Sequence, residues 1–168
     1  HKNLEEIIRS IKGRLIIGTF ASQIERMLKI IEAAEKFGKK VVVEGRSMKN
    51  NIDIVRQTGM LKARKETIIT VEEMEQYPPD RIVVLATGAQ GDEFAALMRM
   101  SNKTHKYLKI SKRDTVLLSA SIVPGNEKAV QKLKDNLARQ GAKIIHYRSS
   151  DVYIHSTGHG NKCELEWI

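Results

Sequence analysis

A pair of histidines late in the chain has the residue types needed for work on a phosphate. His155 and His159 stand four residues apart and enclose Ser156, Thr157 and Gly158. On a helix this spacing would let both rings share a metal ion, but Ser-Thr-Gly does not favour a helix. Because imidazole titrates near neutral pH, such a pair in a hydroxyl-rich loop suits phosphate contact or general acid catalysis. A pair of hydrogen-bonded turn histidines explains the spacing equally well.

Four other segments of small and hydroxyl-bearing residues are suited to the same ligand. Small residues let backbone amides approach a phosphate, and hydroxyl groups donate hydrogen bonds to it. Arg46 adds a forked cation that matches phosphate geometry. For any one segment, turn chemistry is the commoner reason for this composition, so the prediction depends on their agreement. The segments are Gly18-Thr19-Phe20-Ala21-Ser22, Glu44-Gly45-Arg46-Ser47, Thr87-Gly88-Ala89-Gln90-Gly91 and Ser119-Ala120-Ser121.

Alternating strands and helices would bring these segments together. Uniformly apolar strands between helices predict an α/β fold of the Rossmann or flavodoxin-like kind: a three-layer, open, mostly parallel sheet with helices on both faces. The carboxyl ends of parallel strands share one edge, so segments that follow the strands would converge there. Strands are expected at 15–18, 41–43, 67–69, 82–86, 107–110, 116–118, 143–146 and 152–154, and helices at 4–11, 22–37, 48–58, 70–76, 92–100 and 127–139.

The beginnings of two helices carry capping signals. Ser22 and Glu25 have the spacing of a capping box, as have Thr70 and Glu73. Helix N-termini at Ser22 and near Asp92 would direct the positive ends of their dipoles toward the loop edge.

The remaining histidines and the basic connector have plainer interpretations. His105 lies in the Lys-rich stretch Lys103–Arg113, which is expected to be a solvated face, or else to line an RNA path. His146 follows a strand and is expected to be half-buried with its hydrogen bonds satisfied.

Composition narrows the class of protein. The 168 residues suit one domain, and 29 Lys and Arg against 20 Asp and Glu give a net charge of +9, which favours a polyanionic partner such as nucleic acid. A single cysteine, Cys163, excludes an internal disulfide and a cysteine-based zinc site. Apolar runs are too short for a membrane span, and no charged-then-apolar leader opens the chain, so a cytoplasmic location is expected.

Five segments in order resemble the β-CASP domain of ribonuclease J, in the metallo-β-lactamase superfamily of nucleases. Asp92 stands where that family usually has Glu, and Thr157 stands where it commonly has Ser and keeps the hydroxyl. The resemblance runs along nearly the whole chain, through the segments Gly13–Ser22, Val43–Met48, Ala86–Asp92, Ser119–Glu127 and Ile154–His159.

The resemblance implies a domain inserted into a metallo-β-lactamase domain, with RNA in the cleft between them and two zinc ions performing hydrolysis. It implies that His159 is the active-site histidine, which acts on the scissile phosphate or as a proton donor. The residues implied to hold phosphate or RNA in the same cleft are His155, Ser156, Thr157, Gly158, Arg46, Ser47, Thr19, Ser22, Gln90 and Gly91.

The zinc-binding motifs of that superfamily, His-x-His-x-Asp-His and a later Pro-x-His-Gly-Glu, are missing from this sequence. We therefore expect no metal ligand and no cofactor in this chain, with zinc in a parent enzyme that is a 5′-to-3′ exonuclease, an endonuclease or both. Residues 1–168 would be one β-CASP domain excised from that parent, folded but inactive alone. Expected partners are RNA, the metallo-β-lactamase domain of the same polypeptide and, for the parent, further copies of itself, but no membrane.

Two alternatives remain open. One is a stand-alone α/β module that binds RNA or a phosphorylated ligand without catalysis. The other is a Rossmann-type nucleotide-dependent enzyme, which is disfavoured because neither Gly-x-Gly-x-x-Gly nor a Walker-type loop is present.

Overall fold

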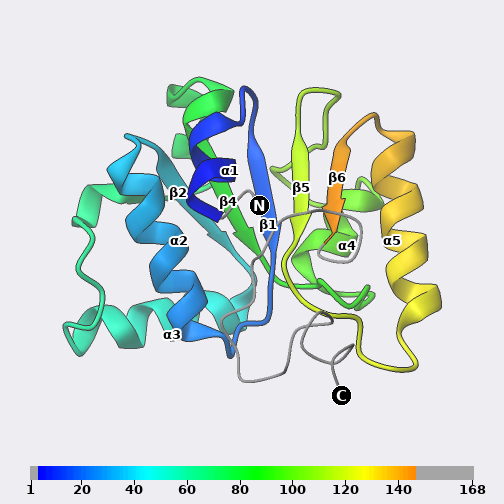
Figure 1. Ribbon diagram of the computed structural model, residues 1–168, viewed down its shortest axis with the longest axis horizontal. Coiled ribbons are helices and arrows are strands. Elements are labelled where there is room, and N and C mark those ends of the chain that lie inside the picture. The colour runs from blue at the N-terminus through cyan, green and yellow to red at the C-terminus, as the bar shows by residue number, and fades with distance from the viewer. Residues whose placement is uncertain (1–3, 147–168) are drawn as a thin grey trace, which may run out of the picture.

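The computed structural model describes residues 4–146, which fold around one six-stranded sheet (Figure 1). The strands lie in the order β3-β2-β4-β1-β5-β6, and every neighbouring pair is parallel. The predicted α/β fold with an open parallel sheet is confirmed. The strands are β1 (Leu15–Gly18), β2 (Lys40–Glu44), β3 (Ile68–Ile69), β4 (Ile82–Ala86), β5 (Thr115–Leu118) and β6 (Lys143–His146).

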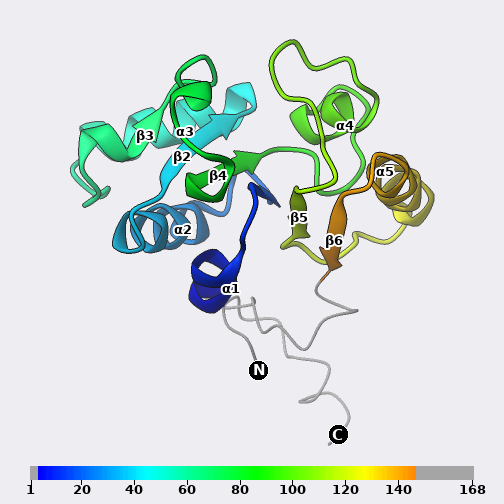
Figure 2. The same cartoon turned by 90° about the horizontal axis from the view of Figure 1, so that it is seen from above.

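Helices cover both faces of the sheet, as Figure 2 shows for α1 and α2 on one side and for α4 and α5 on the other. Buried side chains of α1, α2 and α3 pack in one apolar cluster, and those of α4 and α5 pack in a second. None of the helices within residues 4–146 has the length and apolar character needed to cross a membrane. The helices are α1 (Leu4–Ser10), α2 (Ile24–Lys36), α3 (Arg46–Gln57), α4 (Ala96–Ser101) and α5 (Glu127–Arg139), with short 3-10 turns at η1 (Lys65–Thr67), η2 (Glu73–Gln76) and η3 (Pro79–Arg81).

The central strands are apolar at every position because both of their faces are covered. In β1, Leu15 and Ile17 pack in the cluster of α1, α2 and α3, whereas Ile16 packs in the cluster of α4 and α5. Successive side chains of a strand point to opposite faces, so a strand between two helical layers has no solvent-facing position. This burial explains why the apolar runs of the sequence located the six strands of this sheet.

One of the two predicted capping boxes forms. Thr70 and Glu73 are joined reciprocally, since each backbone N–H donates to the other's side chain, at 2.8 Å and 3.3 Å. The box at Ser22 and Glu25 is wrong. A turn in which the Gln23 N–H donates to the Phe20 carbonyl makes Gln23 the cap residue of α2, and no side chain caps that helix.

Three other expectations need correction or fall outside the described part. The helix expected from 92 begins only at Ala96, because residues 92–95 form a turn in which the Ala95 N–H donates to the Asp92 carbonyl at 3.1 Å. Residues 107–110 are not a strand. The strand expected at 152–154 lies outside the described residues.

The chain leaves β1 and β5 in opposite directions. From β1 it passes through α2 to β2, on one side of the sheet, and from β5 it passes through α5 to β6, on the other side. These two helices pack on opposite faces. The gap between the ends of β1 and β5 is therefore a topological switch point, where open parallel sheets usually bind their ligands.

Candidate functional site

Five strands end at the same level of the sheet. In the pairing register, Ala86 lies beside both Gly18 and Glu44, and Leu118 lies beside both Gly18 and His146. The segments that follow β1, β2, β4 and β5 therefore start side by side at one carboxyl edge. The predicted convergence is confirmed for these four segments, which we call the edge loops: residues 19–23, 45–47, 87–95 and 119–126.

Backbone hydrogen bonds join the first residue of two edge loops to the last residue of a neighbouring strand. The Thr19 N–H donates to the Ala86 carbonyl, and the Thr87 N–H donates to the Glu44 carbonyl, both at 3.1 Å. These bonds hold the beginnings of the two loops at a fixed spacing from the last residues of the strands.

The side chain of Gln90 links two edge loops. Its Nε2 donates to the Ser121 carbonyl at 2.8 Å, and its Oε1 accepts from the Val123 N–H at 2.8 Å and from Asn126 Nδ2 at 3.3 Å. The amide is buried and bonded within the chain. Its predicted contact with phosphate stays a prediction.

Three other predicted residues occupy different depths of the edge. Thr19 is buried, and its hydroxyl donates to Gln23 Oε1 at 3.2 Å. Gly91 is buried with φ +77°, and a Cβ there would lie 2.5 Å from the backbone of Ala129. Ser22 is exposed. Thr19 and Gly91 therefore shape the loops, while Ser22 faces solvent.

Arg46 and Ser47 are the first two residues of α3, and both are exposed. Gly45 precedes them with φ +120°, and a Cβ there would lie 2.5 Å from Thr87 Oγ1. Only glycine meets both the positive φ and this close approach. Gly45 thus fixes where the backbone enters α3 and where Arg46 begins at the carboxyl edge.

The remaining predicted site residues cannot be placed. His155, Ser156, Thr157, Gly158 and His159 lie outside the described residues, and their roles stay predictions.

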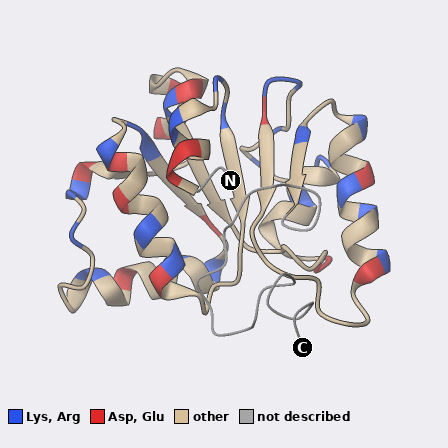
Figure 3. Cartoon of the chain, in the orientation of Figure 1, with Lys and Arg blue, Asp and Glu red and all other residues tan. Residues whose placement is uncertain are grey.

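Positive charge does not concentrate in the edge loops. They carry one basic residue, Arg46, and two acidic residues, Asp92 and Glu93. Figure 3 shows much of the Lys and Arg on helices and at the opposite end of the strands. We call that end the basic amino edge, defined by residues that precede or begin strands: Lys12, Arg14, Lys39, Lys40, Arg81, Lys112, Arg113 and Lys143.

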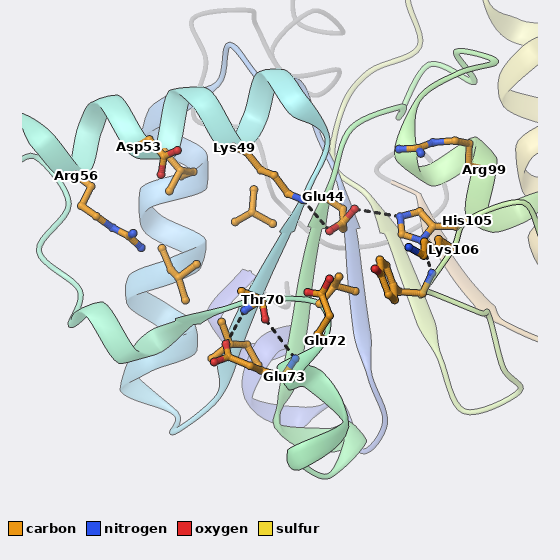
Figure 4. Close-up of a pocket in the computed structure, with 16 residues that line it drawn as sticks. Glu44, Lys49, Asp53, Arg56, Thr70, Glu72, Glu73, Arg99, His105 and Lys106 are labelled. Carbon is orange, nitrogen blue, oxygen red and sulfur yellow. Dashed lines mark hydrogen bonds and ion pairs between the residues drawn. The ribbon is translucent and has the colours of Figure 1, made fainter.

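A buried histidine–carboxylate hydrogen bond that sequence reasoning missed lies beside the edge loops (Figure 4). His105, expected to be solvated, is only 5% exposed, and its Nε2 lies 3.0 Å from Glu44 Oε2. Lys49 Nζ donates to the other carboxylate oxygen at 3.1 Å. The expectation for His105 is wrong because a partner 61 residues away in the sequence buries it. His146 is buried rather than half-buried.

The Glu44–His105 pair adjoins a pocket of about 600 Å³ between α3 and the segment after α4. Side chains of both signs line it, among them Arg56, Arg99, Glu72 and Glu73. A hydrogen bond and charge interaction with Tyr107 raise the pKa of Lys106. A lining of mixed charge does not favour an anion over a cation.

A second missed residue is Arg26, on α2. It is 5% exposed, its Nη1 donates to the Ser119 carbonyl, and burial lowers the pKa of its guanidinium. The sequence does indicate this burial, because Arg26 lies one helical turn before Ile30 and therefore on the apolar face of the helix. A charged residue on such a stripe needs a buried partner or a function.

No group of three His, Cys, Asp or Glu side chains within residues 4–146 is arranged to hold a metal ion. The described residues therefore do not fit a zinc site.

Comparison with known proteins identifies relatives. A family model described as "Ribonuclease J, beta-CASP domain" matches residues 12–137. The chain is 39% identical over 165 residues to ribonuclease J of Mycolicibacterium smegmatis, 39% over 167 residues to ribonuclease J of Thermus thermophilus and 35% over 163 residues to ribonuclease J2 of Bacillus subtilis. These matches cover 97–99% of this chain but 29% of each relative.

The model match covers most of the chain, and it includes β1 to β5, all four edge loops and most of α5. By sequence and by fold, the chain belongs to the ribonuclease J β-CASP domain family.

Proposed function

We propose that this chain is the β-CASP part of a longer, zinc-dependent ribonuclease and forms one wall of its RNA cleft. A metallo-β-lactamase domain of the same polypeptide would form the other wall and hold the zinc ions. The observation that supports the proposal most directly is the convergence of four small, hydroxyl-rich loops at one carboxyl edge, in a chain of this family.

The work assigned to this chain is to bind and orient the RNA backbone. Arg46 and Ser47 are exposed at the beginning of α3, where the guanidinium and the helix N-terminus both favour a phosphate. The hydroxyl of Ser22 and the turn that begins at Thr19 would line the same path. His155, Ser156, Thr157 and Gly158 would hold a phosphate group, such as the 5′-monophosphate end of the RNA.

His159 would act on the scissile phosphate or donate a proton to the leaving oxygen. Zinc chemistry would come from the partner domain, because the described part of this chain offers no ligand set for it. No step of hydrolysis is therefore assigned to residues 4–146.

His159→Ala in the longer protein tests this role. We expect turnover of 5′-monophosphorylated RNA to fall by about 100-fold or more, the usual contribution of a general acid, while RNA affinity stays within a few-fold. The measurements are single-turnover cleavage and fluorescence anisotropy with the same oligonucleotide.

A matched arm assays this chain alone with zinc, and we expect no cleavage. Robust metal-dependent cleavage by the chain alone would contradict the proposed division of labour. Unchanged turnover in the His159→Ala protein would remove the role of His159. RNA binding without any cleavage by the longer protein would instead favour the stand-alone binding module.

A further inference from the structure

The switch point between the carboxyl ends of β1 and β5 holds a buried guanidinium, that of Arg26. At this switch point, the Ser119 N–H donates to the Gly18 carbonyl at 2.9 Å, which extends the β1–β5 ladder by one bond. The N–H and C=O of one strand residue point the same way, so the Ser119 carbonyl also faces β1. Since the chain of β1 has already turned toward α2, no β1 amide can reach that carbonyl, and Arg26 Nη1 donates to it instead.

Of the two terminal nitrogens of the Arg26 guanidinium, only Nη1 donates a hydrogen bond to a described residue. Its Nη2 is buried and has no hydrogen-bond partner among the described residues, nor does any carboxylate of those residues pair with the side chain. Leaving a charged donor buried without a partner costs free energy, and native structures seldom do so without a reason. An unpartnered Nη2 at the switch point, where open parallel sheets usually bind ligands, therefore points to a missing acceptor.

The surroundings of Arg26 favour an anionic acceptor. Arg26 is the third residue of α2, a 13-residue helix whose N-terminus carries no side-chain cap. The positive end of the helix dipole and the guanidinium thus act at the same place. The neighbouring edge loops 19–23 and 119–126 contain no acidic residue that could take the role.

We propose that Arg26 binds a phosphate oxygen of RNA through Nη2, at the switch point between the ends of β1 and β5. That the ligand is RNA rests on the proposed function, whereas the geometry of the site comes from the fold. The Ser119 carbonyl orients one arm of the fork, and the other arm receives the phosphate. Burial strengthens this interaction, because water competes for it less than at the exposed Arg46.

The test uses the full 168-residue chain with a short, single-stranded, 5′-phosphorylated RNA, with affinity measured over a series of salt concentrations. For Arg26→Met we expect about tenfold weaker binding or more, and a slope of log K against log salt that falls by about 0.7, the value for one phosphate neutralised on a single strand. Arg26→Lys keeps the positive charge but lacks the two-pronged guanidinium. It should therefore show the salt slope of the unmodified chain but only part of its affinity.

Lys39→Met is the matched control. Lys39 is also a buried cation, at 7% exposure, burial likewise lowers its pKa, and its Nζ donates to the Ile11 carbonyl at 3.4 Å. It lies at the basic amino edge, away from the switch point. We expect it to keep the affinity and salt slope of the unmodified chain, and urea denaturation of both variants checks that each remains folded.

Titration with inorganic phosphate, followed by the NMR signals of the Arg26 side chain, separates the possible outcomes. RNA binding with an unchanged slope in Arg26→Met would overturn the Arg26 site and leave the proposed function standing. If the chain binds phosphate only when Arg26 is present but does not bind RNA, Arg26 is an anion site, and the proposal that it binds RNA is wrong. If neither RNA nor phosphate binds the unmodified chain, the Arg26 site is overturned, and the cleavage assay of the longer protein decides the proposed function separately.

Discussion

At the scale of single residues, His105 holds a loop to the sheet through both ring nitrogens. Its Nδ1 accepts from the backbone N–H groups of Tyr107 and Leu108, at 3.2 Å and 3.1 Å, so this nitrogen carries no proton. The proton is therefore on Nε2, which donates to Glu44. Since Glu44 is the last residue of β2, the pair ties the segment after α4 to the strand that leads into Arg46.

His105→Ala should destabilise the chain by about 2–3 kcal/mol, because it leaves a buried carboxylate oxygen and two amides without their partner. Urea denaturation measures the loss. His105→Asn is the matched variant, since its Oδ1 can replace Nδ1 as the acceptor, and it should lose less. A cost below about 0.5 kcal/mol for His105→Ala, the size of an ordinary surface change, would show that the pair does not hold the loop.

At the scale of elements, the approach of Gly45 to Thr87 sets how α3 leaves the sheet. The segment after β2 and the segment after β4 touch here with no room for a side chain between them. Because Arg46 directly follows, the position of its backbone depends on this approach. The conformation of the edge loops therefore depends on the spacing between neighbouring strands as well as on the residues of the loops themselves.

Gly45→Ala should cost about 2–4 kcal/mol, from a strained φ together with overpacking against Thr87. Gly59→Ala is the control, since Gly59 also has a positive φ, of +73°, but nothing lies within 4 Å of the Cβ it would gain. We expect it to cost only about 1–2 kcal/mol. Equal losses in thermal denaturation would contradict a role for the close approach.

The sequence located the six strands of the sheet because burial on both faces makes their central residues apolar, as in Ile82–Ala86. It located most helices from the spacing of their apolar residues. It misplaced the starts of α2 and α4, because turns such as Phe20–Gln23 decide where a helix begins. It also could not pair His105 with Glu44, since nothing local indicates an interaction between segments so far apart. The convergence of the edge loops was predictable because it follows from parallel strands alone.

At the scale of the whole molecule, charge is divided between the two edges of the sheet. The basic amino edge collects eight Lys and Arg residues, of which Arg14 is paired with Asp114 at 2.6 Å, whereas the edge loops carry Arg46 together with Asp92 and Glu93. Long polyanions are therefore attracted to the amino edge irrespective of any specific site at the carboxyl edge. The net charge of +9 is thus a poor guide to where RNA would be processed.

Replacing Lys112 and Arg113 by Gln should weaken binding of a long single-stranded RNA and lower its salt slope by about 1.4, or 0.7 for each phosphate that is no longer neutralised. Binding of the short 5′-phosphorylated RNA should change less than about twofold, because its phosphates are expected at the opposite edge. Gel-shift titrations at several salt concentrations measure both. Equal weakening of the two ligands would mean that they share one surface.

The three hydrogen bonds of the Gln90 side chain have a thermodynamic consequence. One amide side chain engages three groups of the loop after β5, so this loop and the loop that carries Gln90 must move as a single body. A ligand arriving there finds its binding groups already assembled and loses little entropy in ordering them. If RNA binds at this edge as proposed, it meets a preformed surface and is selected by its fit to that surface.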